Sequence, residues 1–112
     1  MSKTAIADRR NLDFLLYEFL KVQDWQRWPH FAAHSRDTFE QVVDLSHKLA
    51  LEQFRNHNAL SDRQEPAMQP DGSVKIIPEV AEALRAFAEA GFMAMNADEA
   101  DGGMQLPYTL SL

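Results

Sequence analysis

The 112-residue sequence contains no cysteine, and this absence removes several classes of protein. Without thiols the chain can form no disulfide framework, no thiolate zinc site and no cysteine nucleophile. Long apolar runs are missing too: none approaches the roughly 20 residues that a membrane helix needs. Met1 to Arg10 lack the apolar stretch of a signal peptide. We therefore expect a cytoplasmic protein that does not insert into membranes.

Basic residues are scarce and scattered. The chain has 11 Lys and Arg against 17 Asp and Glu, a net charge of −6, and its longest basic run is Arg9-Arg10. Nucleic acids and anionic membranes are bound by clustered cations, so neither is an expected partner. The apolar fraction of 46% and the charged fraction of 25% are typical of one folded globular domain.

Apolar residues recur at helical spacing, which predicts an all-α fold, a small bundle of orthogonal or up-and-down helices. The first predicted helix covers 12–22, with Asp8 or Asn11 as its cap. One or two helical turns follow over 23–35, where Pro29 suits a first helical position and the aromatic rings of Trp25, Trp28 and Phe31 are expected over the core. The second long helix is expected from Asp37, in a capping box with Glu40, to about Leu60.

A third helix is expected from Pro78 to about Ala90, with Pro78 in its first turn and Gly91 just beyond its end. The stretch 61–77 breaks the helical pattern, and Asp71-Gly72 predicts a turn followed by an extended piece from Val74. The predicted core consists of residues that share these helical stripes: Leu16, Phe19, Val43, Phe54, Leu84 and Phe87.

We expect a single helical domain over 1–112, made of an N-terminal extension helix in 1–26 and a helical domain in 36–112. Leu106 to Leu112 resemble the opening of another helix with Pro107 at its first position, so the domain is expected to be cut short there. Such a front piece of a larger protein should expose apolar surface and self-associate. The candidates for that surface are Phe92, Met93, Met95, Leu106, Tyr108, Leu110 and Leu112.

His30, His34 and Asp37 have a spacing that could place them at one metal corner, but two imidazoles without a fixed third ligand make a poor site, and a solvated helix face is favoured. The acids before Gly102 lack the bidentate acid that a calcium loop needs after its glycine. Gly102-Gly103 lack the lysine and hydroxyl of a phosphate loop. The residues alone thus assign no catalytic, cofactor-binding or metal residue.

Three segments taken in order resemble the N-terminal helical domain of the acyl-CoA dehydrogenase family, in its longer members with an N-terminal extension. They are Asp13 to Leu20; Asp71 to Val74 with Pro78 and Leu84 to Phe92; and Asp98 to Pro107, an acidic turn with paired glycines before Leu-Pro. The chain departs from the family after the paired glycines. It has Met104 and Gln105 where members commonly carry Gln and then Gly.

The resemblance implies a flavoprotein oxidoreductase of fatty acid metabolism. Such enzymes remove the α-proton of an acyl-CoA thioester with a carboxylate base and pass the β-hydride to FAD. The flavin-binding parts and the base lie in later domains, so this chain alone is expected to bind no cofactor and to be inactive. Its implied partners are the remaining domains, the acyl-CoA substrate through the full enzyme, and further copies in a homo-oligomer. The implied wall of the acyl pocket is Gly102, Gly103, Leu106 and Pro107.

An alternative of a different class stays open: a stand-alone acidic helical module that binds a protein partner. The expected cut at Pro107 favours the enzyme domain over this module. A small metal-binding helical protein, which depends only on His30 and His34, is a third and weaker alternative.

Overall fold

The computed structural model describes residues 6–112, so the first five residues of the expected extension lie outside it. The chain is mostly helical, as the apolar spacing predicts, with one small hairpin added. Two π-helical turns, Phe14–Phe19 and Ala50–Phe54, directly continue the first and second helices. The helices are α1 (Arg9–Asp13), α2 (Arg36–Leu49), α3 (Arg55–Arg63), α4 (Pro78–Glu89) and α5 (Tyr108–Ser111), with short 3-10 turns at Val22–Arg27, Pro29–Phe31, Phe92–Ala94 and Glu99–Asp101.

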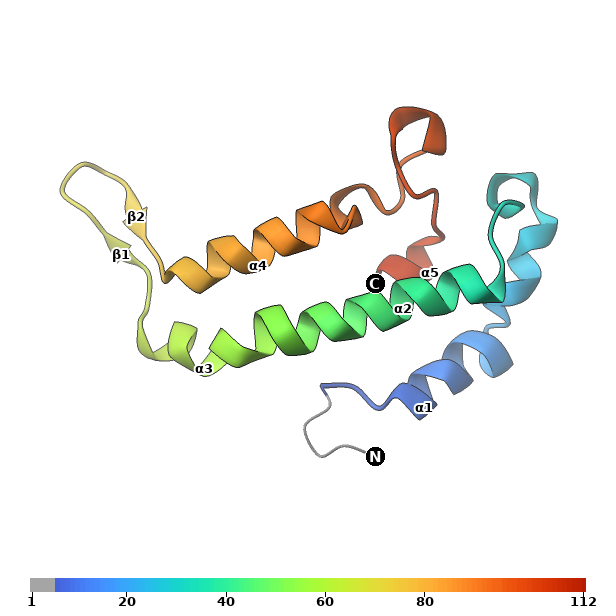
Figure 1. Cartoon of the computed structure of the whole chain (residues 1–112), viewed down its shortest axis with the longest axis horizontal. Coiled ribbons are helices and arrows are strands. Elements are labelled where there is room, and N and C mark those ends of the chain that lie inside the picture. The colour runs from blue at the N-terminus through green and yellow to red at the C-terminus, as the bar shows by residue number, and fades with distance from the viewer. Residues whose placement is uncertain (1–5) are drawn as a thin grey trace.

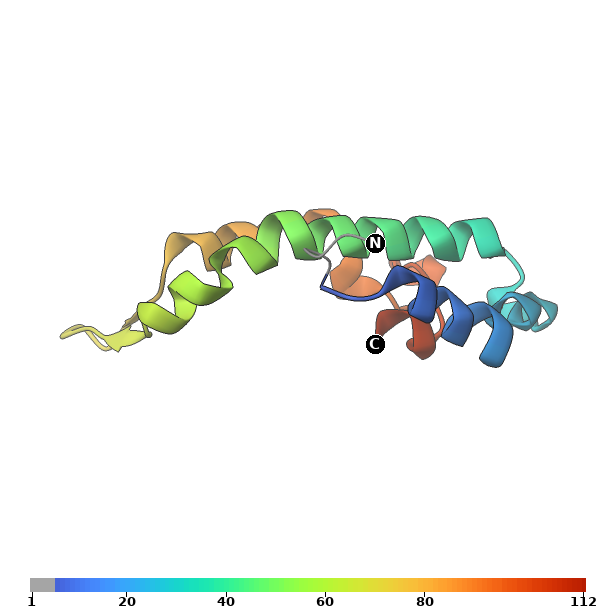
Figure 2. The same cartoon turned by 90° about the horizontal axis from the view of Figure 1, so that it is seen from below.

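The elements form a flat layer. In Figure 1, α2 and α3 run as one long helix beside α4, and the hairpin of β1 (Ala67–Met68) and β2 (Val74–Lys75) joins them at one end. Figure 2 shows α1 and α5 on the same side of the long helix. The principal extents are 55 × 38 × 17 Å and the radius of gyration is 17.2 Å. A compact domain of this length would have a radius of gyration of about 13 Å, so much of this layer has no second layer to pack on.

The caps of the first two helices settle where they start. Asp8 accepts hydrogen bonds from the backbone N–H of Arg10 at 3.0 Å and of Asn11 at 3.4 Å, which confirms it as the cap of α1. The expected cap of the next helix is wrong. Ser35 has extended backbone (φ −140°, ψ 174°) and forms a capping box with Thr38, so Asp37 already lies inside the first turn.

The ends of the later elements follow proline and glycine. Pro78 lies in the first turn of α4, and Gly91 ends that helix at φ 85°, both as expected. Pro107 has extended backbone and precedes α5, so its placement as the first helical residue is wrong. The predicted turn and extended piece are confirmed, since β2 follows Gly72 (φ 87°) and pairs antiparallel with β1.

The core lies where α2 meets the N-terminal helix and the segment after α4. Leu16 and Val43 are buried, as predicted, whereas Phe54 and Phe87 are only half-buried. Two predictions are wrong: Phe19 is 70% exposed and Leu84 is 48% exposed. The buried cluster is Leu16, Tyr17, Val22, Phe39, Val42, Val43, Phe92, Met95 and Leu106.

The first error comes from the assumption of a regular α-helical face, and the second from the choice of the wrong residue on a regular face. In the π turn the backbone bonds run from i to i+5, so the face rotates and Tyr17 is buried in place of Phe19. On α4 the buried residue is Ala83, 1% exposed, one position before Leu84. Its small side chain lets α4 approach its neighbours closely, and the buried stripe is therefore shifted by one residue.

The expected exposed patch is also partly wrong. Phe92, Met95 and Leu106 are buried because the segment after α4 folds back into the core. Met93, at 69%, and Tyr108, at 73%, are exposed as expected. Leu112 is exposed and Leu110 is half-buried against the core.

Two phenylalanines test this assignment of the core. Replacing Phe39 by Ala should lower the free energy of unfolding by roughly 3–5 kcal/mol, because this ring is completely buried and its loss leaves a cavity. Replacing Phe19 by Ala should change it by less than about 0.5 kcal/mol. Urea denaturation followed by circular dichroism measures both. Equal losses for the two variants would contradict the placement of the π turn.

Candidate functional site

An apolar groove of about 420 Å³ opens between the N-terminal helix, α2 and α5. Its volume lies in the range of small-molecule pockets in proteins. Among the described residues that line it, His47 has the one ionisable side chain, so the groove can bind apolar groups but offers no pair of side chains for acid–base chemistry. Its walls include Leu16, Val43, Leu49, Phe54, Phe92 and Leu110.

Three aromatic rings give the groove a stiff wall. Phe54 and Phe87 meet edge to face with centroids 6.4 Å apart, and Phe87 meets Phe92 in the same way at 5.4 Å. These distances are the favourable geometry for aromatic pairs. The three rings come from the second π turn, α4 and the following 3-10 turn, so the wall joins the two long helices.

Both π turns border this groove. Leu16 belongs to the first π turn, and Ala50 and Phe54 to the second. A π turn is a costly departure from the α-helix and often occurs at functional sites. Here both turns contribute side chains to the lining of one apolar space.

The loop between α4 and α5 carries the four residues of the expected pocket wall. We call Asn96 to Pro107 the glycine loop. Its backbone is tied internally: Gly103 N–H donates to Asp98 O, and Gln105 N–H to Ala97 O, both at 3.0 Å. The side-chain amide of Asn96 donates to Leu106 O at 2.9 Å. The loop is therefore a compact unit with its own hydrogen bonds.

Glycine is favoured at positions 102 and 103 for two different structural reasons. Gly102 has φ 85°, a conformation that disfavours a side chain, but an added Cβ would meet nothing within 4 Å. Gly103 sits against the backbone of Ala97, where an added Cβ would lie 2.1 Å from the carbonyl oxygen. Only glycine fits at the second position.

The structure separates the four expected wall residues. Gly102 is exposed and Gly103 half-buried, while Leu106 and Pro107 are buried. None of the four lines the apolar groove, which instead receives Thr109 to Leu112. The exposed part of the glycine loop and the groove are thus two separate surfaces.

Gln105 is the residue that sequence reasoning treated only as a departure. It has φ 54°, in the left-handed region that favours glycine. Its side chain accepts from Glu99 N–H at 2.8 Å and donates to His30 O at 2.7 Å. The one sequence signal that could have found it is a non-glycine residue where the resembling family commonly has glycine.

The two histidines that were weighed as a metal corner have other contacts. His34 Nε2 lies 2.9 Å from Gln105 O, and because a carbonyl only accepts, this nitrogen donates. His30 Nε2 lies 3.9 Å from Asp98 Oδ1, an ion pair only when the imidazole is protonated. Across residues 6–112, no group of three His, Asp or Glu side chains is arranged to hold a metal.

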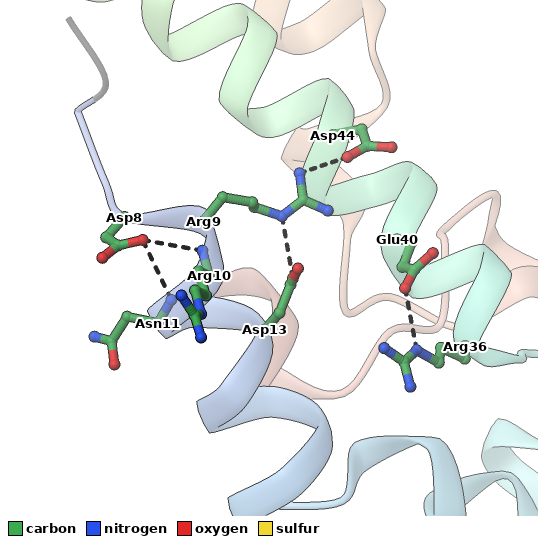
Figure 3. Close-up of polar contacts among 8 residues, drawn as sticks. All are labelled: Asp8, Arg9, Arg10, Asn11, Asp13, Arg36, Glu40 and Asp44. Atoms are coloured by element: carbon green, nitrogen blue, oxygen red, sulfur yellow. Dashed lines mark hydrogen bonds and ion pairs between the residues drawn. The ribbon is translucent and has the colours of Figure 1, made fainter. Parts of the chain in front are cut away.

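A second, polar recess of about 680 Å³ lies between the N-terminal helix and the start of α2. Arg9 joins this helix to α2 by bonding both Asp13 and Asp44, as Figure 3 shows beside the Arg36–Glu40 pair. The lining residues are Arg10, Asp13, Phe14, Tyr17, Glu18, Gln23 and Arg36.

Tyr17 forms the floor of this recess. The guanidinium of Arg36 lies 4.1 Å from the centre of its ring. Its buried hydroxyl and the buried Oε1 of Gln23 find no hydrogen-bond partner in the described part of the chain. Burial, with the charges of Glu40 and Asp13, raises the pKa of Tyr17 to about 12. The phenol is therefore neutral under ordinary conditions.

The chain matches no protein-family model, and no curated protein matches it significantly. In residues 6–112 no helix has both the length and the hydropathy to cross a bilayer.

The difference between the paired glycines can be measured. Gly102→Ala should cost about 1 kcal/mol of stability, the penalty for a side chain in the left-handed region. Gly103→Ala should cost about 1–3 kcal/mol, since its Cβ would displace the Ala97 backbone. Thermal unfolding of both variants is the measurement, and a larger loss at Gly102 would contradict the close approach at Gly103.

The raised pKa of Tyr17 has a consequence at high pH. The folded state disfavours the phenolate, so the stability contributed by this group is present below pH 10 and is lost as pH rises towards 12. Tyr17→Phe should abolish this loss of stability at high pH and leave stability near neutral pH unchanged or slightly higher, since the hydroxyl lacks a partner. Denaturation at several pH values, with the phenolate absorbance as a second readout, decides this; identical pH profiles would refute the buried phenol.

Proposed function

We propose that this chain is the N-terminal helical domain of an FAD-dependent acyl-CoA dehydrogenase-like oxidoreductase. The observation that carries the proposal is the ordered set of three segments on one helical layer. Asp13 to Leu20 lie in the N-terminal helix and its π turn. Asp71 to Phe92 form a turn, a strand and α4 closed by Gly91, and Asp98 to Pro107 form most of the glycine loop before α5.

In this proposal the complete protein oxidises the Cα–Cβ bond of an acyl-CoA thioester. A carboxylate base takes the α-proton and FAD takes the β-hydride, and both are supplied by other domains. This chain contributes no catalytic or flavin-binding residue. Its part is to present the glycine loop as a section of the acyl pocket wall, with Gly102 and Gly103 near the surface and Leu106 and Pro107 anchoring the loop from behind.

The flat shape supports a domain that packs on other domains. A layer 17 Å thick with an open apolar groove leaves surface that further protein would cover. Obligate interfaces between domains and subunits are commonly apolar in this way. The proposal accordingly includes the remaining domains and a homo-oligomer as partners, and the cytoplasm as the compartment.

A stand-alone acidic helical module that binds a protein partner is the second candidate. The observation that favours it is the same open groove, which a partner helix could fill, together with the net charge of −6. The two candidates differ in what surrounds the chain. The enzyme domain needs flavin-binding and base-bearing domains in the same polypeptide, and the module does not.

Purification of the protein encoded by the whole reading frame tests the proposal. We expect a yellow protein whose flavin is bleached by an acyl-CoA in the absence of oxygen, whereas residues 1–112 alone should bind FAD neither tightly nor stoichiometrically. A stop codon directly after Leu112, or a colourless full-length protein, would contradict the enzyme and favour the module. Stoichiometric flavin on residues 1–112 would contradict the assignment of the flavin site to other domains.

A further inference from the structure

Gln105 uses every polar group it has to hold three parts of the chain together. Its N–H donates to Ala97 O and its side-chain oxygen accepts from Glu99 N–H, both inside the glycine loop. Its side-chain nitrogen and its carbonyl oxygen reach outwards, to His30 O and to His34 Nε2. The last two partners lie 75 and 71 positions earlier in the sequence.

The backbone of Gln105 shows that these bonds offset a cost. A residue with a Cβ is strained in the left-handed region, and glycine would remove the strain. The two side-chain hydrogen bonds oppose that strain and favour the observed conformation. The side-chain bonds of Gln105 thus add to the backbone bonds that close the loop.

His34 links Gln105 to the core, because it bonds to the Gln105 carbonyl and its ring packs near Phe39. Its ring lies 5.8 Å, centre to centre, from the completely buried ring of Phe39 at the start of α2. Its bond to the carbonyl of Gln105 requires the Nε2–H tautomer in the neutral ring. The glycine loop, the 3-10 turn Pro29–Phe31 and the start of α2 are thus joined through two adjoining side chains.

We propose that Gln105 is a positioning residue that fixes the glycine loop against residues 29–34, so that the two segments move as one body. The consequence is that the surface at Gly102 and Gly103 is preset and does not need a ligand to order it. This inference does not depend on the proposed enzymatic function, because it concerns the isolated chain and all of its contacts lie within it.

Three substitutions separate the parts of this connection. Gln105→Ala removes both side-chain bonds and keeps the strain. Gln105→Gly removes both bonds and the strain. Gln105→Glu keeps the acceptor for Glu99 N–H but faces His30 O with a second acceptor. Gln41→Ala, at an exposed position of α2, is the matched control for loss of a glutamine side chain.

Hydrogen exchange of the 112-residue chain is the first readout. We expect the Glu99 amide to exchange about fivefold faster or more in the Ala and Gly variants, as for a lost hydrogen bond, and to stay protected in the Glu variant. The amides of Ala32 and His34 should exchange faster in all three. Exchange of the Glu99, Ala32 and His34 amides should not change in the Gln41→Ala control, and exchange of the core amide of Val43 should not change in any variant. Wild-type protection at Glu99 in the Gly variant would overturn the proposal, because the backbone alone would then hold the loop.

The tautomer of His34 is the second readout, and it is insensitive to a general loss of stability in a protein that stays folded. Every variant keeps the carbonyl at position 105. A free neutral imidazole populates both tautomers with Nε2–H in the majority, so the Nε2–H tautomer stays fully populated only if the loop stays in place. We expect the nitrogen chemical shifts of the His34 ring to move towards a tautomer mixture in Gln105→Ala. Unchanged shifts together with unchanged exchange at Ala32 and His34 would show that Gln105 does not position the loop.

Discussion

The one-sided packing of α2 is the constraint on which the rest of the structure depends. Its inner face buries Phe39, Val42 and Val43 against the N-terminal helix and the glycine loop, and no second layer covers the remainder of α2 and α4 in residues 6–112. Burial of apolar area is the main favourable term in folding, so a layer 17 Å thick has few ways to gain stability. Every later feature, from the open groove to the tied loop, follows from this limited core.

Local features, namely the two π turns and the hydrogen bonds of the glycine loop, position the segments that lie outside the core. The first π turn buries Leu16 and Tyr17 and leaves Phe19 outside, and both π turns contribute residues to the lining of the apolar groove. The glycine loop depends on Gly103 for its close approach to Ala97, and its own backbone bonds replace the support of a neighbouring layer.

Helical class, approximate helix positions and the 71–76 turn were predictable because apolar spacing, proline and glycine act locally. The buried faces were predicted less well. A π turn cannot be recognised from a 3.6-residue apolar period. On α4 the larger apolar residue, Leu84, was predicted to be buried, but the small neighbouring Ala83 is the buried one. Gly103 and Gln105 belong to a recognisable motif, but the sequence does not show what they contact. Gly103 lies against the backbone of Ala97, and Gln105 bonds to His30, which is 75 positions earlier. Long-range contacts of this kind carry no local pattern.

We propose that the open groove is a surface that further protein covers. Sedimentation velocity of residues 1–112 over a concentration series tests it most directly, with Leu110→Asp in the groove and Met68→Asp on the distant exposed hairpin as a matched pair. The account predicts reversible association, most simply as a two-fold dimer, that Leu110→Asp weakens and Met68→Asp leaves unchanged. A wild-type chain that stays monomeric at high micromolar concentration would contradict it.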